Sequence, residues 1–183
     1  MYSRNSIRNW VYSKDNDIIA DLKRLVNIRS VSNIEDKMKP YGEGCRKVLE
    51  EMIEVSANKG FETKNYDYHL GAAFFNKERE DYPTVGLWGH LDVVPEGEDW
   101  DLPPYELTKK GDFLIGRGIQ DNKGPVIGLL YALKCLEELK IPIKYNLKLF
   151  FGCNEEIGME DVKYFAKNYK TQALSIVAAS GFP

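Results

Sequence analysis

The stretch TVGLWGHLDVV, residues 84–94, is an apolar run that contains one histidine and one aspartate. A run of this kind predicts a strand that is buried on both faces, as in a sheet covered by helices. Side chains alternate along a strand, so His90 and Asp92 are expected to share one face. The stretch therefore predicts a buried sheet with a polar pair near the end of one strand.

Apolar spacing predicts the elements on either side of this strand. Helices are expected over residues 17–29, 42–59, 124–138 and 160–169, with Gly60 ending the second and Pro125 near the start of the third. Strands are expected over residues 61–68, 71–75 and 145–151, and a hairpin over 105–116 with its turn at 110–112. Gly71 is expected to separate the first two strands. Helices and strands alternate, which predicts a layered α/β domain.

Composition excludes several classes of protein. The net charge is -3 and no basic run is interleaved with aromatic residues, so we expect no nucleic-acid partner. The apolar stretches are too short to cross a bilayer, and residues 1–14 lack the apolar core of a signal peptide. Three widely spaced cysteines are expected to be reduced thiols in the interior. These features predict a cytoplasmic enzyme domain that is not bound to a membrane.

Three polar clusters interrupt the apolar pattern, and in an α/β fold we expect them at the carboxyl ends of strands, where ligands bind. The first is the pair His90 and Asp92. The second is Asp121 with Asn122, between Gly118 and Gly124. The third is the adjacent pair Glu155 and Glu156. Each also has a simpler explanation: a core histidine held by an aspartate, a helix N-cap, and a solvated acidic turn. Together they supply imidazole and carboxylate donors that suit zinc, cobalt or manganese.

Three runs in the same order resemble the metal motifs of the co-catalytic zinc metallopeptidases. They are WGHLDVVP at 88–95, GRGIQDNKGP at 116–125 and NEEIG at 154–158. The run WDLPPY at 100–105 also matches, and YGEG at 41–44 is similar to the subgroup of broad-specificity bacterial dipeptidases. The family also includes aminoacylase, succinyl-diaminopimelate desuccinylase and glutamate carboxypeptidase. The resemblance extends from about residue 17 to the end of the sequence.

The resemblance implies a layered α/β/α catalytic domain with a central mixed sheet. Residues 1–183 would form its N-terminal part, without the lid or dimerisation domain and the C-terminal catalytic segment. It implies metal-dependent hydrolysis of a peptide bond, most directly in a dipeptide. Removal of the acyl or succinyl group from an N-acyl amino acid is also compatible. The expected substrate is therefore a small peptide or an N-acyl amino acid.

The resemblance also implies a role for each polar residue. His90 would bind the first of two Zn²⁺ ions, with Asp92 orienting its ring, and Asp121 would bridge both ions. Glu156 would bind the second ion, and Glu155 would be the general base that activates water. Co²⁺ or Mn²⁺ could replace zinc. The peptide bond between Asp121 and Asn122 would be cis, as is usual in the family.

The sequence departs from the family pattern at two ligands. If Phe182 and Pro183 set the register, Ala179 stands where the family has an aspartate ligand. A late histidine ligand is missing, and the other histidine, His69, is expected at the surface of a strand or turn. An inactive remnant, or a domain that binds one metal ion, is therefore the alternative function. We expect little activity from these residues alone, and either self-association or a missing C-terminal half as the partner.

Overall fold

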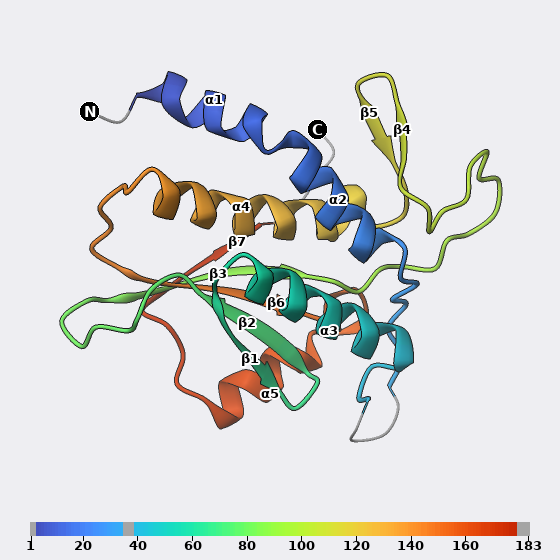
Figure 1. Cartoon of the computed structure of the whole chain (residues 1–183). Helices are drawn as coiled ribbons and strands as arrows, with labels where there is room; N and C mark the ends of the chain where they lie inside the picture. The colour runs from blue at the N-terminus through green and yellow to red at the C-terminus, as the bar shows by residue number, and fades with distance from the viewer. Residues whose placement is uncertain (1–2, 35–38, 179–183) are drawn as a thin grey trace.

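A five-stranded mixed sheet forms the centre of the computed structural model, which describes residues 3–34 and 39–178 (Figure 1). In spatial order the strands are β1 (Glu62–Tyr66), β2 (Leu70–Phe74), β6 (Asn146–Gly152), β3 (Thr84–His90) and β7 (Leu174–Val177). The pairs β1–β2 and β2–β6 are antiparallel, whereas β6–β3 and β3–β7 are parallel. The prediction of a central mixed sheet is confirmed.

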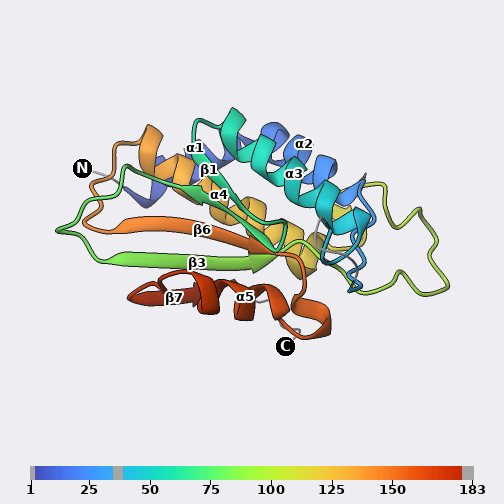
Figure 2. The same cartoon turned by 90° about the horizontal axis from the view of Figure 1, so that it is seen from below.

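Helices cover both faces of this sheet, which confirms the layered α/β/α architecture. On one face lie α1 (Arg4–Ser13), α2 (Asp15–Val26), α3 (Glu43–Asn58) and α4 (Gly124–Glu138). On the opposite face lies α5 (Glu160–Asn168), below the sheet in Figure 1. Figure 2 shows β6 and β3 running side by side through the middle of the sheet, with β7 next to β3.

The larger apolar core lies between the sheet and the four helices of the first face. Leu25 of α2, Leu49 of α3 and Leu130 of α4 are fully buried there. They pack in one cluster with Leu149 and Phe151 of β6. Burial of these side chains holds the helices on the sheet, since each apolar side chain removed from water contributes about 1.5–3 kcal/mol.

A smaller aromatic cluster lies under α5. Phe150 of β6 stacks on Trp88 of β3, with ring centroids 4.3 Å apart, and Phe165 of α5 meets both rings edge to face. Beside this cluster β7 leaves Leu174 and Ile176 exposed, at 56% and 50%. The α5 face is therefore less completely covered by the described residues than the face that carries α1–α4.

The four predicted helices all form. Residues 17–29 correspond to α2, 42–59 to α3, 124–138 to α4 and 160–169 to α5, and each end lies within three residues of the prediction. Gly60 follows α3 with a φ of 92°, a conformation that favours glycine, and Pro125 lies in the first turn of α4. The hairpin also forms, from β4 (Thr108–Lys110) and β5 (Phe113–Ile115).

The predicted break between the first two strands at Gly71 is wrong. β1 ends at Tyr66, the turn occupies residues 67–69, and Gly71 lies inside β2. Asp67 and Tyr68 have positive φ angles of 52° and 61°, which let the chain reverse without glycine. Gly71 is opposite Phe151 on β6, where an added Cβ would collide with the phenyl ring. This glycine therefore permits close packing between strands instead of a turn.

Two other strand boundaries differ from the prediction. β3 ends at His90, so Asp92 lies just beyond the strand and not within it. The strand expected over residues 145–151 is β6, which begins one residue later and leaves Tyr145 exposed. β6 places Leu149 and Phe151 on one face of the sheet and Phe150 on the other, and all three are fully buried.

Helix α1 and strand β7 were not predicted, nor were the short turns η1 and η2 described below. Ser3 caps α1 through a reciprocal pair of hydrogen bonds with Ser6, and the buried Trp10 donates from Nε1 to Glu138 at 2.8 Å. Helix α1 therefore docks on α4 through Trp10, which is its buried residue. The short strand β7 has no buried residue, so its sequence lacks the pattern that marks a core strand.

The three cysteines are free and buried, which confirms the prediction of reduced interior thiols. They are Cys45, Cys135 and Cys153. Among the described residues, no helix combines the length and the apolar character needed to cross a bilayer.

Candidate metal centre

Two parallel strands bring the first and third polar clusters together. His90 is the last residue of β3, and Glu155 and Glu156 lie in the 3-10 helix η2 (Glu155–Ile157) just after β6. The strands are parallel and His90 pairs with Gly152, so both carboxyl ends reach the same edge of the sheet. The expectation that these clusters lie at the carboxyl ends of strands is confirmed.

Asp121 reaches the same place from a different element. It lies in the π-helical turn η1 (Ile119–Lys123), between the β4–β5 hairpin and α4. Asp121 does not directly follow a strand of the central sheet, but it lies at the carboxyl end of β3 beside His90, where the polar clusters were expected. The helix-cap explanation is wrong, because α4 has Lys123 at its N-cap and no side-chain cap hydrogen bond. The peptide bond from Asp121 to Asn122 is cis, as the resemblance implied.

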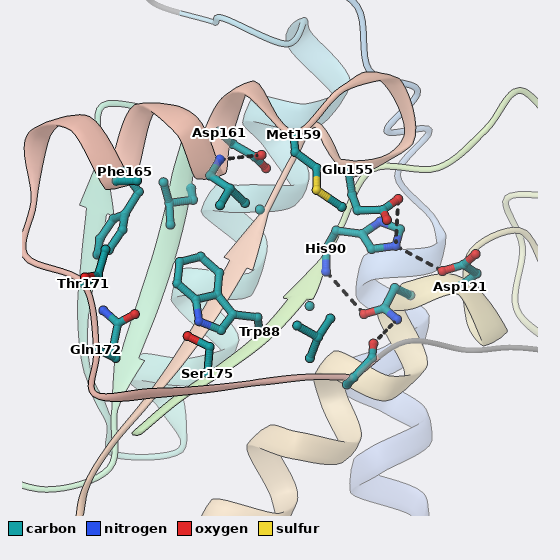
Figure 3. Close-up of a pocket in the computed structure, with 18 residues that line it drawn as sticks. Trp88, His90, Asp121, Glu155, Met159, Asp161, Phe165, Thr171, Gln172 and Ser175 are labelled. Carbon is teal, nitrogen blue, oxygen red and sulfur yellow. Dashed lines mark hydrogen bonds and ion pairs between the residues drawn. The ribbon is translucent and has the colours of Figure 1, made fainter. Parts of the chain in front are cut away.

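Figure 3 shows the side chains of His90, Asp121 and Glu155 with their polar atoms directed toward one another. His90 Nε2 lies 3.0 Å from Asp121 Oδ1 and 3.8 Å from Glu155 Oε2. His90, Asp121 and Glu156 each offer one donor atom, and these three atoms lie within 4.8 Å of one another. One imidazole and two carboxylates form a donor set that suits a divalent ion such as zinc, manganese or cobalt.

Asp92 connects His90 with the backbone of η2. The Nδ1 atom of His90 lies 3.0 Å from the Asp92 main-chain oxygen and 3.4 Å from its Oδ1. The Asp92 carboxylate is fully buried and accepts hydrogen bonds from the backbone N–H groups of Glu155 and Glu156, at 3.2 and 3.1 Å. His90 is thus a buried histidine held by an aspartate at Nδ1, as the simpler explanation has it. Its other ring nitrogen, Nε2, faces Asp121 and Glu155, which that explanation does not account for.

The Asn122 side chain holds the backbone near His90 through two hydrogen bonds. Its Oδ1 accepts the backbone N–H of His90 at 3.3 Å, and its Nδ2 donates to the main-chain oxygen of Ala178 at 2.6 Å. Asn122 is 1% exposed, so its amide joins β3, η1 and the end of β7 inside the protein. Sequence reasoning named Asn122 only as a polar neighbour of Asp121. An amide between two glycines and a helix gave no signal for this role.

A second buried carboxylate, Asp161, fixes the segment that carries Glu155 and Glu156. Its Oδ2 accepts the backbone N–H groups of Cys153 and Asn154, at 2.7 and 3.0 Å. The Asn154 side chain in turn donates to Ser32 Oγ at 2.9 Å. Sequence reasoning missed Asp161, because it treated residues 160–169 only as an amphipathic helix.

Burial and neighbouring charges shift the acidity of the central groups. Burial disfavours the charged form of His90, but the hydrogen bond and charge of Asp92, together with Glu155, outweigh it and raise the pKa of His90 to about 9. Burial also raises the pKa of Glu156, and Asp121 and Asp92 add to this rise while His90 opposes it. The metal-free cluster thus holds a proton on His90 at neutral pH, and a bound cation would replace that proton.

A cavity of about 360 Å³ opens beside the candidate metal centre. His90, Asp121 and Glu155 line one end, and Trp88 and Phe165 line its apolar part (Figure 3). The indole Nε1–H of Trp88 has no hydrogen-bond partner among the described residues. The donors therefore face space that a small molecule or a further polypeptide segment can enter.

His69 and Ala179 were singled out in the sequence for the two ligands that the family pattern lacks here. His69 lies in the turn before β2, as expected, and its side chain is partly buried. Its Nδ1 is 2.7 Å from Tyr41 Oη, and its ring stacks on Tyr164. It is not a member of the three-donor group. Ala179 lies outside the described residues.

The model of the peptidase family M20/M25/M40 matches residues 86–181, which is more than half of the chain and contains all three motifs. A protein of Staphylococcus aureus strain USA300 named "Putative dipeptidase" is 33% identical over 177 residues. The match covers 94% of this chain but only 37% of that relative, and a protein of the same name from strain NCTC 8325 gives the same values.

Solved structures share the fold. Human carnosine dipeptidase 1 superposes with a TM-score of 0.76 at 20% identity, over 97% of this chain and 41% of the other. A di-peptidase of Saccharomyces cerevisiae gives a TM-score of 0.73 at 19% identity, over 89% of this chain and 37% of the other. The chain belongs to peptidase family M20/M25/M40, which confirms the resemblance to the co-catalytic metallopeptidases, and it spans 37% of the length of its S. aureus relatives.

Proposed function

We propose that this member of peptidase family M20/M25/M40 carries the metal-binding and acid-base residues of a dipeptidase. One observation carries the proposal: donor atoms of His90, Asp121 and Glu156 lie within 4.8 Å of one another, with Glu155 beside them. The names of the S. aureus relatives support a dipeptide as the substrate. Metal-dependent hydrolysis of a peptide bond follows from the family and from this donor set.

We assign His90, Asp121 and Glu156 as metal ligands, with Asp121 as the bridging carboxylate of a two-ion site. A bound divalent ion supplies a Lewis acid that makes the attacking water more acidic and polarises the scissile carbonyl. Zinc fits one imidazole and two carboxylates, and cobalt or manganese fits the same donors. A two-ion site needs more donors than the three that the described residues bring together.

Glu155 is the proposed general base. Its side chain is 42% exposed and faces the cavity end where His90 and Asp121 lie, so it can reach a water molecule there. It takes a proton from the attacking water and passes it to the leaving amine. Asp92 orients the imidazole by contact with Nδ1 and leaves Nε2 directed toward the ligands.

We further propose that residues 1–183 correspond to the N-terminal part of the catalytic domain and that the remaining ligands come from a further polypeptide segment. The 37% coverage of the S. aureus relatives supports this assignment. The free buried cysteines are consistent with the predicted cytoplasmic location. The purified 183-residue chain is therefore expected to hydrolyse dipeptides slowly or not at all, and rapid hydrolysis would contradict this division of the site.

A chimera tests the dipeptidase assignment directly. The chain replaces the 177 matched residues of the S. aureus relative, and hydrolysis of dipeptides is compared with hydrolysis of an N-acyl amino acid. We expect zinc-dependent dipeptide hydrolysis that falls about 100-fold or more in Glu155→Gln, because general base catalysis contributes that much. A folded chimera that prefers the N-acyl amino acid would favour a deacylase. A folded chimera whose activity is unchanged by Glu155→Gln would overturn the assignment of the base.

A further inference from the structure

Lys123 is a fully buried lysine close to the candidate metal centre. It is 0% exposed, and its Nζ donates to the main-chain oxygens of Leu25 at 3.0 Å and Ile28 at 2.9 Å. A buried ammonium group is unfavourable unless hydrogen bonds and opposite charge compensate the loss of water. Methionine would fill a similar volume without this penalty, so the two hydrogen bonds of Nζ have a use that packing alone does not explain.

The two acceptors lie where a cation is favoured. Leu25 is in the last turn of α2 and Ile28 follows its end, where the carbonyl groups carry the negative end of the helix dipole. The Leu25 carbonyl also accepts the backbone N–H of Ile28 at 3.2 Å, so Lys123 is an additional donor to it. Lys123 thus ties η1 to the end of α2 through a contact between segments 98 residues apart in sequence.

Lys123 lies in the same turn as Asp121, so its hydrogen bonds to α2 hold the backbone of that turn in place. It lies two residues after Asp121, and its backbone N–H donates to Gly118 at 2.8 Å, which closes the turn that contains Asp121. The Asp121 side chain is 55% exposed and its one hydrogen bond given by the described residues is to His90. The backbone of η1 therefore sets where this carboxylate can point.

We propose that Lys123 is a positioning residue that anchors η1 and so holds Asp121 in place for the metal ion. This inference rests on the proposed function in one respect, namely that Asp121 binds a metal ion. Lys123 touches neither metal nor substrate in this account. It acts through the backbone of the turn, in the way that buried partners orient metal ligands in other sites.

Tyr131 provides a matched control. Its hydroxyl donates to Asp21 Oδ2 at 2.6 Å, so it also joins the η1–α4 segment to α2 by a buried hydrogen bond. It lies on α4, well after the turn that carries Asp121. Tyr131→Phe removes a buried contact between the same two segments and leaves the anchor of η1 intact.

The first experiment measures zinc affinity by chelator competition and the visible absorption spectrum of bound Co²⁺ in the wild type, Lys123→Met, Lys123→Arg and Tyr131→Phe. We expect Lys123→Met to bind zinc about 10- to 100-fold more weakly and to change the cobalt spectrum, as losses of supporting contacts do. Lys123→Arg keeps the charge and the donors and should retain more affinity. Tyr131→Phe should stay within about threefold of the wild type. Equal affinities and spectra in Lys123→Met and Tyr131→Phe would overturn the proposal.

The second experiment needs no metal. Amide hydrogen exchange of residues 119–124 is measured in the metal-free chain, with circular dichroism to confirm folding. We expect faster exchange in Lys123→Met than in Tyr131→Phe, and the same rates in both would contradict the anchor. If Lys123→Met does not fold, Lys123→Arg should show a smaller change in the same direction, and no change would overturn the proposal. If the wild type binds no zinc, the proposed function fails while these exchange rates still decide the role of Lys123.

Discussion

The two halves of the candidate metal centre differ in how they are held. The inner half consists of His90, Asp92 and Asn122, which are 7%, 0% and 1% exposed. In the outer half, the side chains of Asp121 and Glu155 are 55% and 42% exposed. Buried hydrogen bonds position the inner half whether or not an ion is present. The outer carboxylates have few partners among the described residues, so a cation is the partner that would order them.

The largest expected effect is the difference in stability between the variants Asp92→Ala and Asp121→Ala. Asp92→Ala removes a fully buried carboxylate and leaves the partly buried N–H groups of Glu155 and Glu156 without an acceptor. We expect the free energy of unfolding to fall by about 3 kcal/mol or more. Asp121→Ala removes an exposed carboxylate and should change it by less than about 1 kcal/mol. Urea unfolding of both metal-free variants measures the difference. Equal losses would remove the distinction between the two halves.

The pH dependence of the free energy of unfolding tests the protonation of His90 in the inner half. The pKa of His90 is raised to about 9, so its charged form stabilises the metal-free fold fully below pH 6.5, and this contribution is lost as the pH rises through about 9. Burial lowers the pKa of Lys123 to about 7, which acts in the opposite direction above pH 7. The prediction therefore concerns the difference in unfolding free energy between the wild type and His90→Gln.

Between about pH 6 and pH 9.5 the advantage of the wild type over His90→Gln should shrink by about 3 kcal/mol. Urea unfolding at the two pH values measures it, and Lys123 cancels because both proteins contain it. An advantage that stays constant or grows with pH would show that Asp92 and Glu155 do not hold a proton on His90.

The smallest effect separates two adjacent residues of the third motif. Glu156→Gln removes a proposed ligand and should weaken zinc binding by about 100-fold, whereas Glu155→Gln removes the proposed base and should weaken it by less than about tenfold. The two substitutions are isosteric and neighbouring, so each is the control of the other. Chelator competition measures both affinities, and the reverse order would exchange the assigned roles.

Most of the fold followed from the sequence because its helices and core strands carry regular apolar patterns. Helix α4 was predicted with the same first and last residues that the structure has, since Pro125 marks its start and its buried face is continuous. The turn at residues 67–69 escaped prediction because Asp67 and Tyr68 adopt positive φ angles without glycine. Gly71 was misleading, because it serves the packing of Phe151 and not a turn.

At the site, the polar clusters could be predicted from the sequence, but the framework that supports them could not. His90, Asp121 and Glu156 were named as ligands, and the fold brings them together, although their roles remain predictions. Asn122, Lys123 and Asp161 act through contacts with segments distant in the chain or with the backbone. Local spacing carries no information about such contacts, so they appear only when the chain is folded.

The most direct test of the account is the number of metal ions that the purified chain binds. Zinc or cobalt is supplied in excess, removed from solution, and the ion that remains bound is counted per chain in the wild type, His90→Ala and Asp121→Ala. We expect about one ion or more per wild-type chain and a loss of binding in both variants, because each removes one of three donors. A folded wild-type chain that retains no ion, or variants that bind as the wild type does, would contradict the claim that these three side chains form a metal centre.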